Sequence, residues 1–268
     1  MPGIAHRAMT AFLLSVCCFG LHAQDGVVSP VEARLERIEL YGMALRAQQA
    51  AIDLCTRENA EAFAVYQAAA NAGQAENLAT LEQTAQAQAA VLAYYVQRLI
   101  ETQQKLATEH DALADAYRAA DQPGLAEPSS VSAGTLWEKA TDNLAAQADQ
   151  LSREGNLDEC GKAYERSAGF CEKAASSWRQ ALVCARALGS ATNDLTYESR
   201  GAAAAAGLRR MLRNAAKAYF NAYQAHKNRA ATVAGDVEAR QVGEEWLLAA
   251  QSHVQYERIS QRLAALPE

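Results

Sequence analysis

The chain has 268 residues, a formal net charge of −6, 50% hydrophobic residues and only 7% aromatic residues. A mildly acidic composition argues against general nucleic-acid binding, because such proteins present basic surfaces to the phosphate backbone. Much of the hydrophobic content is alanine, proline is scarce, and no segment alternates polar with β-branched residues. These features predict an all-α fold of long antiparallel helices.

The first 23 residues have the features of a signal peptide. Arg7 is the only charged side chain before Asp25, and an apolar run from Ala8 to Leu21 follows it. Ala23 provides a small residue at the expected cleavage point. The apolar run is shorter than the roughly 20 residues that a membrane span needs. We therefore expect an exported protein, periplasmic or secreted, with no transmembrane span in the mature chain.

Cleavage would leave about 245 residues, enough for one extended domain or two small ones. It removes Arg7 and no acidic residue, so the formal charge changes from −6 to −7. Lipid anchoring would use Cys17 or Cys18. Bacterial lipoprotein signals have a small residue just before the cysteine, and Val16 or Cys17 does not suit that place. We therefore expect no lipid anchor.

A long helix is predicted to begin at Ser29. Ser29 suits the N-cap, Pro30 the first helical position and Glu32 the third, which together form a capping box with proline at N1. The helix can run to about Ala72, where Gly73 ends it.

A second long helix follows, with small or large apolar residues every seven positions. These are Leu78, Ala85, Leu92, Leu99, Leu106, Leu113 and Ala120. Such spacing keeps one stripe of a helix facing a partner helix. Residues 29–120 are therefore predicted to form a long antiparallel helical hairpin.

The stretch DQPGLAEPSSVSAG, residues 121–134, has the composition of a linker, with two prolines, two glycines and three serines. It is predicted to separate the hairpin from a second helical region, residues 135–268. Helices are expected there at 135–153, 157–188, 193–230 and 236–266, separated by Gly155, Gly189 and Gly235. GAAAAAG, residues 201–207, offers a smooth helix face that lets a neighbouring helix approach closely.

Residues 140–189 resemble a tetratricopeptide repeat unit, a helix–turn–helix of 34 residues. Asn156 is a good N-cap for the second helix. The matching positions are Leu144, Ala148 and Leu151 in the first helix, Gly155 at the turn, and Asp158, Glu159, Cys160, Tyr164 and Ser167 in the second. The resemblance implies helical hairpins that bind a peptide or partner helix in a concave groove. It departs from the family at Glu172, which stands where the repeat ends in proline.

Two interpretations of this region remain open, a repeat with a turn near residues 169–172 or one continuous helix from Leu157 to Leu188. The cysteines distinguish them. On a continuous helix Cys160 and Cys184 lie about 36 Å apart, far beyond bridging distance. With a turn they face one another, which makes them a candidate disulfide in an exported protein. Alternatively all four cysteines of the mature chain are small buried residues.

No pattern of catalytic, cofactor-binding or metal-ligating residues is found in the sequence. His110, His226 and His253 lie on different predicted helices. His253 and Glu257 can share a helix face, but a solvated polar pair explains them better than a metal site. We therefore predict no cofactor and no enzymatic activity.

Seven basic residues and no acidic residue occur between Ser199 and Gly235. Arg209, Arg213 and Lys217 recur every four residues and so line one helix face, with Arg210 beside them. This basic face is a candidate binding surface for a partner protein or an anionic envelope component. The competing interpretation is that these basic side chains pair with acidic helices of the same molecule.

The sequence thus predicts an exported helical scaffold or adaptor that mediates protein–protein interactions in the bacterial envelope. One alternative is a structural coiled-coil protein that associates with itself through the apolar stripe of residues 78–120. Another is a helical ligand sensor or enzyme whose site forms only in three dimensions.

Overall fold

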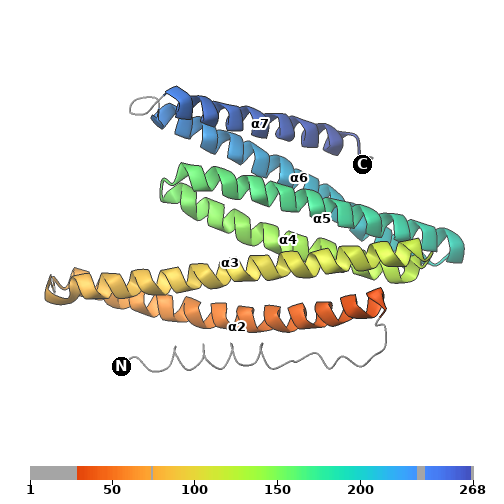
Figure 1. Ribbon diagram of the computed structural model, residues 1–268, viewed down its shortest axis with the longest axis horizontal. Helices are drawn as coiled ribbons and strands as arrows, with labels where there is room; N and C mark the ends of the chain where they lie inside the picture. Colours follow the sequence, from red (N-terminus) through yellow and green to blue (C-terminus); the bar gives the residue numbers. More distant parts are fainter. Residues whose placement is uncertain (1–28, 74, 234–238, 267–268) are drawn as a thin grey trace.

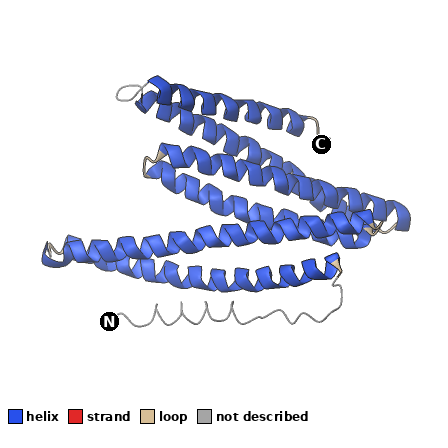
Figure 2. Ribbon diagram, in the orientation of Figure 1, coloured by secondary structure: helices blue, strands red, loops and turns tan. Residues whose placement is uncertain are grey.

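The computed structural model describes residues 29–73, 75–233 and 239–266, which are helical except for short turns (Figure 2). The predicted all-α fold is confirmed, and these ranges contain no strand. The helices are α2 (Pro30–Asn71), α3 (Ala75–Ala119), α4 (Pro123–Arg153), α5 (Leu157–Thr192), α6 (Leu195–Val233) and α7 (Ala239–Ala264). The predicted signal peptide, Gly235 and the expected helix start at Asp236 lie outside the described residues.

The helices are stacked antiparallel in chain order (Figure 1). Each helix packs mainly against the helices before and after it in the sequence, so α2 and α7 form the two ends of the array. This arrangement resembles the architecture of helical repeat proteins, in which successive elements bury a continuous core between neighbours. Among the described helices, α2 and α7 each have a neighbour on one side only.

The α2–α3 hairpin forms as predicted. Ser29 Oγ accepts the Glu32 amide at 3.2 Å, and Glu32 accepts the Ser29 amide in return at 2.9 Å, which completes the capping box. The middle of the seven-residue stripe, Leu99, Leu106 and Leu113, is buried within the chain. These three leucines are therefore part of the intramolecular core.

The predicted linker at 121–134 is wrong, because α4 already begins at Pro123. The turn is limited to the residues around Asp121, which adopts a positive φ of 54°. Pro123 occupies the first helical position, where a missing amide costs nothing. The serines, alanines and Gly134 that suggested a loop are mostly buried instead, since small side chains allow neighbouring helices to pack closely. Pro128 lies inside the helix.

Residues Leu157–Thr192 form the single helix α5, so the turn that a repeat requires near 169–172 is absent. The continuous-helix interpretation is confirmed. The expected break at Gly189 is wrong as well, because the helix continues to its C-cap at Asn193, which adopts the left-handed conformation with φ 52°. The turn at Gly155 and the cap at Asn156, which accepts the Glu159 amide at 3.4 Å, agree with the sequence.

The core between α4, α5 and α6 is built around Trp178. A Cβ on Gly134 of α4 would lie 2.9 Å from the Trp178 ring, and one on Gly207 of α6 would lie 2.6 Å from it. Both distances are far shorter than ordinary contact, so only glycine lets the two helices approach the indole. The close contact predicted for GAAAAAG is therefore present at Gly207.

Candidate functional site

Several basic residues of α6 form ion pairs with neighbouring helices. Arg200 pairs with Glu127 of α4. Arg210 pairs with Glu138 of α4 at 2.6 Å, and Arg229 with Glu245 of α7 at 2.7 Å. Arg210 was predicted to belong to the partner-binding face, but its side chain is turned towards α4 and joins two helices of the same molecule. For these residues the intramolecular interpretation of the basic segment is the correct one.

The other members of the predicted basic face have a different environment. Arg213 and Lys217 are exposed on α6, and Arg209 is half-buried beside a groove that also involves α5 and α7. The structure therefore brings Arg209 together with residues that the sequence did not associate with it.

This groove, which we call the arginine groove, has a volume of about 420 Å³, and no acidic side chain of the described residues lines it. It is lined by Arg179, Leu182, Val183 and Arg186 of α5, by Ala205, Leu208, Arg209 and Leu212 of α6, and by Arg262, Ala265 and Leu266 at the end of α7. Four arginines thus surround seven apolar residues. Arg262 forms an ion pair with Glu172 at 3.2 Å.

The sequence of α5 explains why the groove is basic. From Lys173 to its end at Thr192, this helix carries three basic residues and no acidic one. Arg179 and Arg186 are seven residues apart, with Leu182 and Val183 between them, so all four share one face of the helix. Facing α5 is the part of α6 without acidic residues. Two helix segments without carboxylates therefore meet at one apolar surface.

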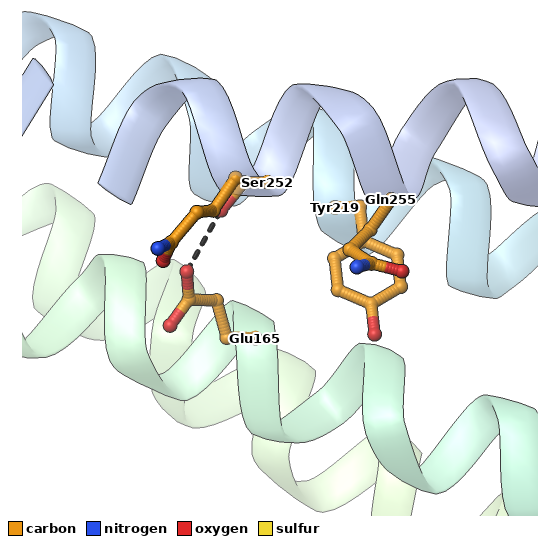
Figure 3. A pocket seen from close by; sticks show the side chains of 5 residues that line it. Glu165, Tyr219, Ser252 and Gln255 are labelled. Atoms are coloured by element: carbon orange, nitrogen blue, oxygen red, sulfur yellow. Dashed lines mark hydrogen bonds between the residues drawn. The ribbon is translucent and has the colours of Figure 1, made fainter. Parts of the chain in front are cut away.

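A second cavity, which we call the polar pocket, lies between α5, α6 and α7 (Figure 3). It has a volume of about 540 Å³ and is lined by Glu165, Tyr219, Gln251, Ser252 and Gln255. Ser252 Oγ donates a 2.7 Å hydrogen bond to Glu165 Oε1, drawn as a dashed line in Figure 3. The Tyr219 hydroxyl donates to Glu172 at 2.8 Å, and burial together with this carboxylate raises the pKa of Tyr219.

Next to the polar pocket, His226 of α6 is fully buried between two carboxylates. Its Nδ1 lies 3.0 Å from Glu245 of α7, and its Nε2 lies 3.4 Å from Glu165 of α5. Burial opposes protonation of the ring, but the two carboxylates outweigh it and raise the pKa of His226 above the ordinary 6.5. The ring also packs on Gly161, where a Cβ would lie 2.6 Å from it. His226 thus joins three helices.

Ser252, Glu165 and His226 do not have the order of a nucleophilic triad. Ser252 contacts the carboxylate and not the imidazole, whereas serine is activated by a histidine that touches it. Burial disfavours ionisation of Glu165, but its contacts with His226 and Ser252 outweigh burial and lower its pKa, which makes it a weak base. This cluster holds α5, α6 and α7 together. His253 and Glu257, 3.6 Å apart, form an exposed pair on α7, as expected.

The candidate disulfide between Cys160 and Cys184 is incompatible with the structure. Cys55, Cys160, Cys171 and Cys184 are all free and buried. Cys160 and Cys184 lie on the same continuous helix, about 36 Å apart at 1.5 Å per residue. All four instead act as small side chains within helix contacts.

We therefore predict that peptide mapping without reductant will find no Cys160–Cys184 cross-link. Burial raises the pKa of the Cys171 thiol from 9.0 to about 12, so its thiolate fraction near neutral pH falls by about a thousandfold. Alkylation of Cys171 by iodoacetamide should be slowed by at least that factor in the native protein and restored in urea. Rapid native alkylation of Cys171, or a mapped Cys160–Cys184 bond, would contradict the structure.

In the part of the chain that the structure describes, no group of three or more His, Cys, Asp or Glu side chains could hold a metal ion. Within the same ranges none of the helices is apolar enough over a sufficient length to cross a bilayer.

Comparison with known proteins identifies no family model and no curated protein that matches the chain. Among solved structures, the chain is similar to a DHF58 filament, at 14% identity over 87% of this chain and 95% of that one, with a TM-score of 0.28. It is also similar to the de novo designed helical repeat protein DHR64, at 13% identity over 82% and 97% of the two chains, with a TM-score of 0.21. Similarities at these TM-scores carry no information about function.

Proposed function

We propose that this chain is an exported adaptor that binds a partner protein through the arginine groove. The single observation that carries the proposal is the meeting of four arginines with an apolar floor on α5, α6 and α7. Apolar surface supplies most of the binding free energy at such sites, and arginine is enriched in protein interfaces because it pairs with carboxylates in a fixed geometry. The predicted signal peptide supports a place in the periplasm or outside the cell.

The resemblance to tetratricopeptide repeats remains a proposal for the hairpin around Gly155 alone. Cys160 and Tyr164 of α5 belong to one buried cluster with Ala148 of α4, and Leu151 packs against that cluster. The continuation of α5 through Glu172 does not follow the repeat.

Capture experiments with charge variants test the adaptor proposal. The mature chain, immobilised, is expected to retain a specific protein from the envelope fraction of the source organism. The double variant Arg179→Glu/Arg186→Glu should lose that protein, because charge reversal in the groove repels an acidic partner. The matched control Arg46→Glu/Arg57→Glu makes the same charge change at exposed positions of α2 and should retain it. If the wild-type chain retains no specific protein, the adaptor proposal fails.

Self-association is a second candidate function, favoured by apolar side chains exposed on α2 and α3. They include Leu40, Met43, Leu54, Phe63, Val65, Val91 and Tyr94. Light scattering of the mature chain distinguishes the two functions. The adaptor proposal predicts the mass of a monomer, whereas a dimer that Phe63→Asp and Tyr94→Asp dissociate would favour self-association.

A further inference from the structure

The arginine groove lies at the place where α7 ends. α6 has 39 residues and α7 only 26, and α7 folds back along the C-terminal part of α6. In Figure 1 the joined ends of α5 and α6 extend beyond the C-terminal end of α7. Arg262, Ala265 and Leu266, at that end, form one wall of the groove. Among the described residues, no helix lies above the first turns of α6 on this side.

The α5 side of the groove is apolar as well as basic, and Val183 is 58% exposed there. The first turn of α6 carries one acidic residue, Glu198. α6 is 13 residues longer than α7, about 20 Å at 1.5 Å per residue, so several turns of a further helix can lie on it past Ala264.

We propose that the arginine groove binds an acidic amphipathic helix of the partner protein, which lies on α5 and α6 in line with α7. The inference rests on the proposed adaptor function and specifies the chemistry of the partner. Amphipathic helices bind apolar grooves through residues spaced i, i+3, i+4 and i+7.

The spacing of the rim arginines fits such a helix. Arg179 and Arg186 are two turns apart on α5, about 10.5 Å, which is also the distance between residues i and i+7 of an adjacent helix. Carboxylates two turns apart on the partner can therefore meet both guanidinium groups. The side chain of Ala205 is small, so it leaves room for an apolar residue above Leu208 and Leu212 of the floor.

The test uses a fluorescent synthetic helix of about 18 residues, with leucines on one face and glutamates on the others, and measures anisotropy. A second peptide carries lysine in place of each glutamate. The proteins are the full mature chain, Arg179→Glu/Arg186→Glu, Val183→Asp and the α2 control Arg46→Glu/Arg57→Glu. All four altered arginines and Val183 are exposed, and circular dichroism checks that each variant is folded. Phosphatidylglycerol vesicles form a third arm.

We expect the glutamate peptide to bind the wild-type chain and the α2 control equally, and both groove variants at least about tenfold more weakly. The lysine peptide should not bind. Equal binding to the groove variants would overturn the inference, as would binding of the vesicles and not of the glutamate peptide. A partner captured equally by wild type and Arg179→Glu/Arg186→Glu would leave the adaptor function standing and remove only the groove. Peptide binding without any captured partner would support an acidic-helix site in the groove and remove the adaptor function.

Discussion

Replacing Trp178 with alanine is expected to lower the free energy of unfolding by about 3–5 kcal/mol, the usual cost of removing a buried tryptophan. The indole is only 9% exposed and lies between Gly134 of α4 and Gly207 of α6. Neither glycine has a side chain that could fill the space vacated by the indole, so the substitution creates a cavity at the contact of three helices. Urea unfolding followed by far-ultraviolet circular dichroism measures the change.

Trp246→Ala is the matched control. Trp246 is 48% exposed on α7, so its removal is expected to cost no more than about 0.5 kcal/mol. Equal losses from the two substitutions would contradict the position of Trp178 in the core.

The second large effect is expected at His226. His226→Gln should lower the free energy of unfolding by about 3 kcal/mol, because it leaves the buried Glu245 and the half-buried Glu165 without the positive charge between them. Glu245 keeps its ion pair with Arg229, whereas Glu165 keeps only the hydrogen bond from Ser252.

The pH dependence of stability provides the specific signature of His226. Its folded-state pKa is raised above 6.5, so the folded state binds the proton more tightly than the unfolded state. This contribution is fully present below about pH 6.5 and is lost as the pH rises through the raised value. The charged groups that face the ring or its partners are Glu165, Glu245, Arg229 and Asp158. The wild-type chain should therefore lose stability above pH 6.5.

Chemical denaturation at a series of pH values tests this assignment, with His110→Gln as the control. Burial lowers the pKa of His110, so its contribution has the opposite sign and is lost as the pH falls below 6.5. His226→Gln should flatten the stability curve above pH 6.5, and His110→Gln should affect only the acidic side. An unchanged slope in His226→Gln would show that the histidine is not held between the two carboxylates.

Local chemistry in the sequence predicted the starts of α2 and α5, whereas the start of α4 depends on packing between helices. Ser29 and Asn156 cap helices through contacts within four residues, so their roles can be recognised without a structure. Residues 123–134 were wrongly predicted to be a linker, because small residues occur both in loops and at close contacts between helices. Gly134 is a close helix contact because it packs against Trp178, which lies more than 40 positions further along the chain.

The candidate site was predictable only in part, for the same reason. The basic segment of α6 indicated Arg209, but successive residues of a helix point about 100° apart. Arg210 therefore faces α4, although it directly follows Arg209. Arg179, Arg186 and Arg262 were missed because they lie on two other helices and join Arg209 only through packing. The contacts of His226 likewise come from α5 and α7. In the sequence, the small residue Gly161 is the one sign that a bulky side chain packs closely against α5.

Site-specific photo-crosslinking tests most directly whether the arginine groove binds a partner protein. A photoreactive amino acid replaces Val183 in the arginine groove or, as a control, Leu54 on α2, both of which are exposed in the folded chain. The account predicts that only the Val183 protein forms an adduct with a partner protein, through a segment in which carboxylates alternate with apolar residues at helical spacing. An adduct formed equally at Leu54, or none at Val183 when the partner is bound, would contradict it.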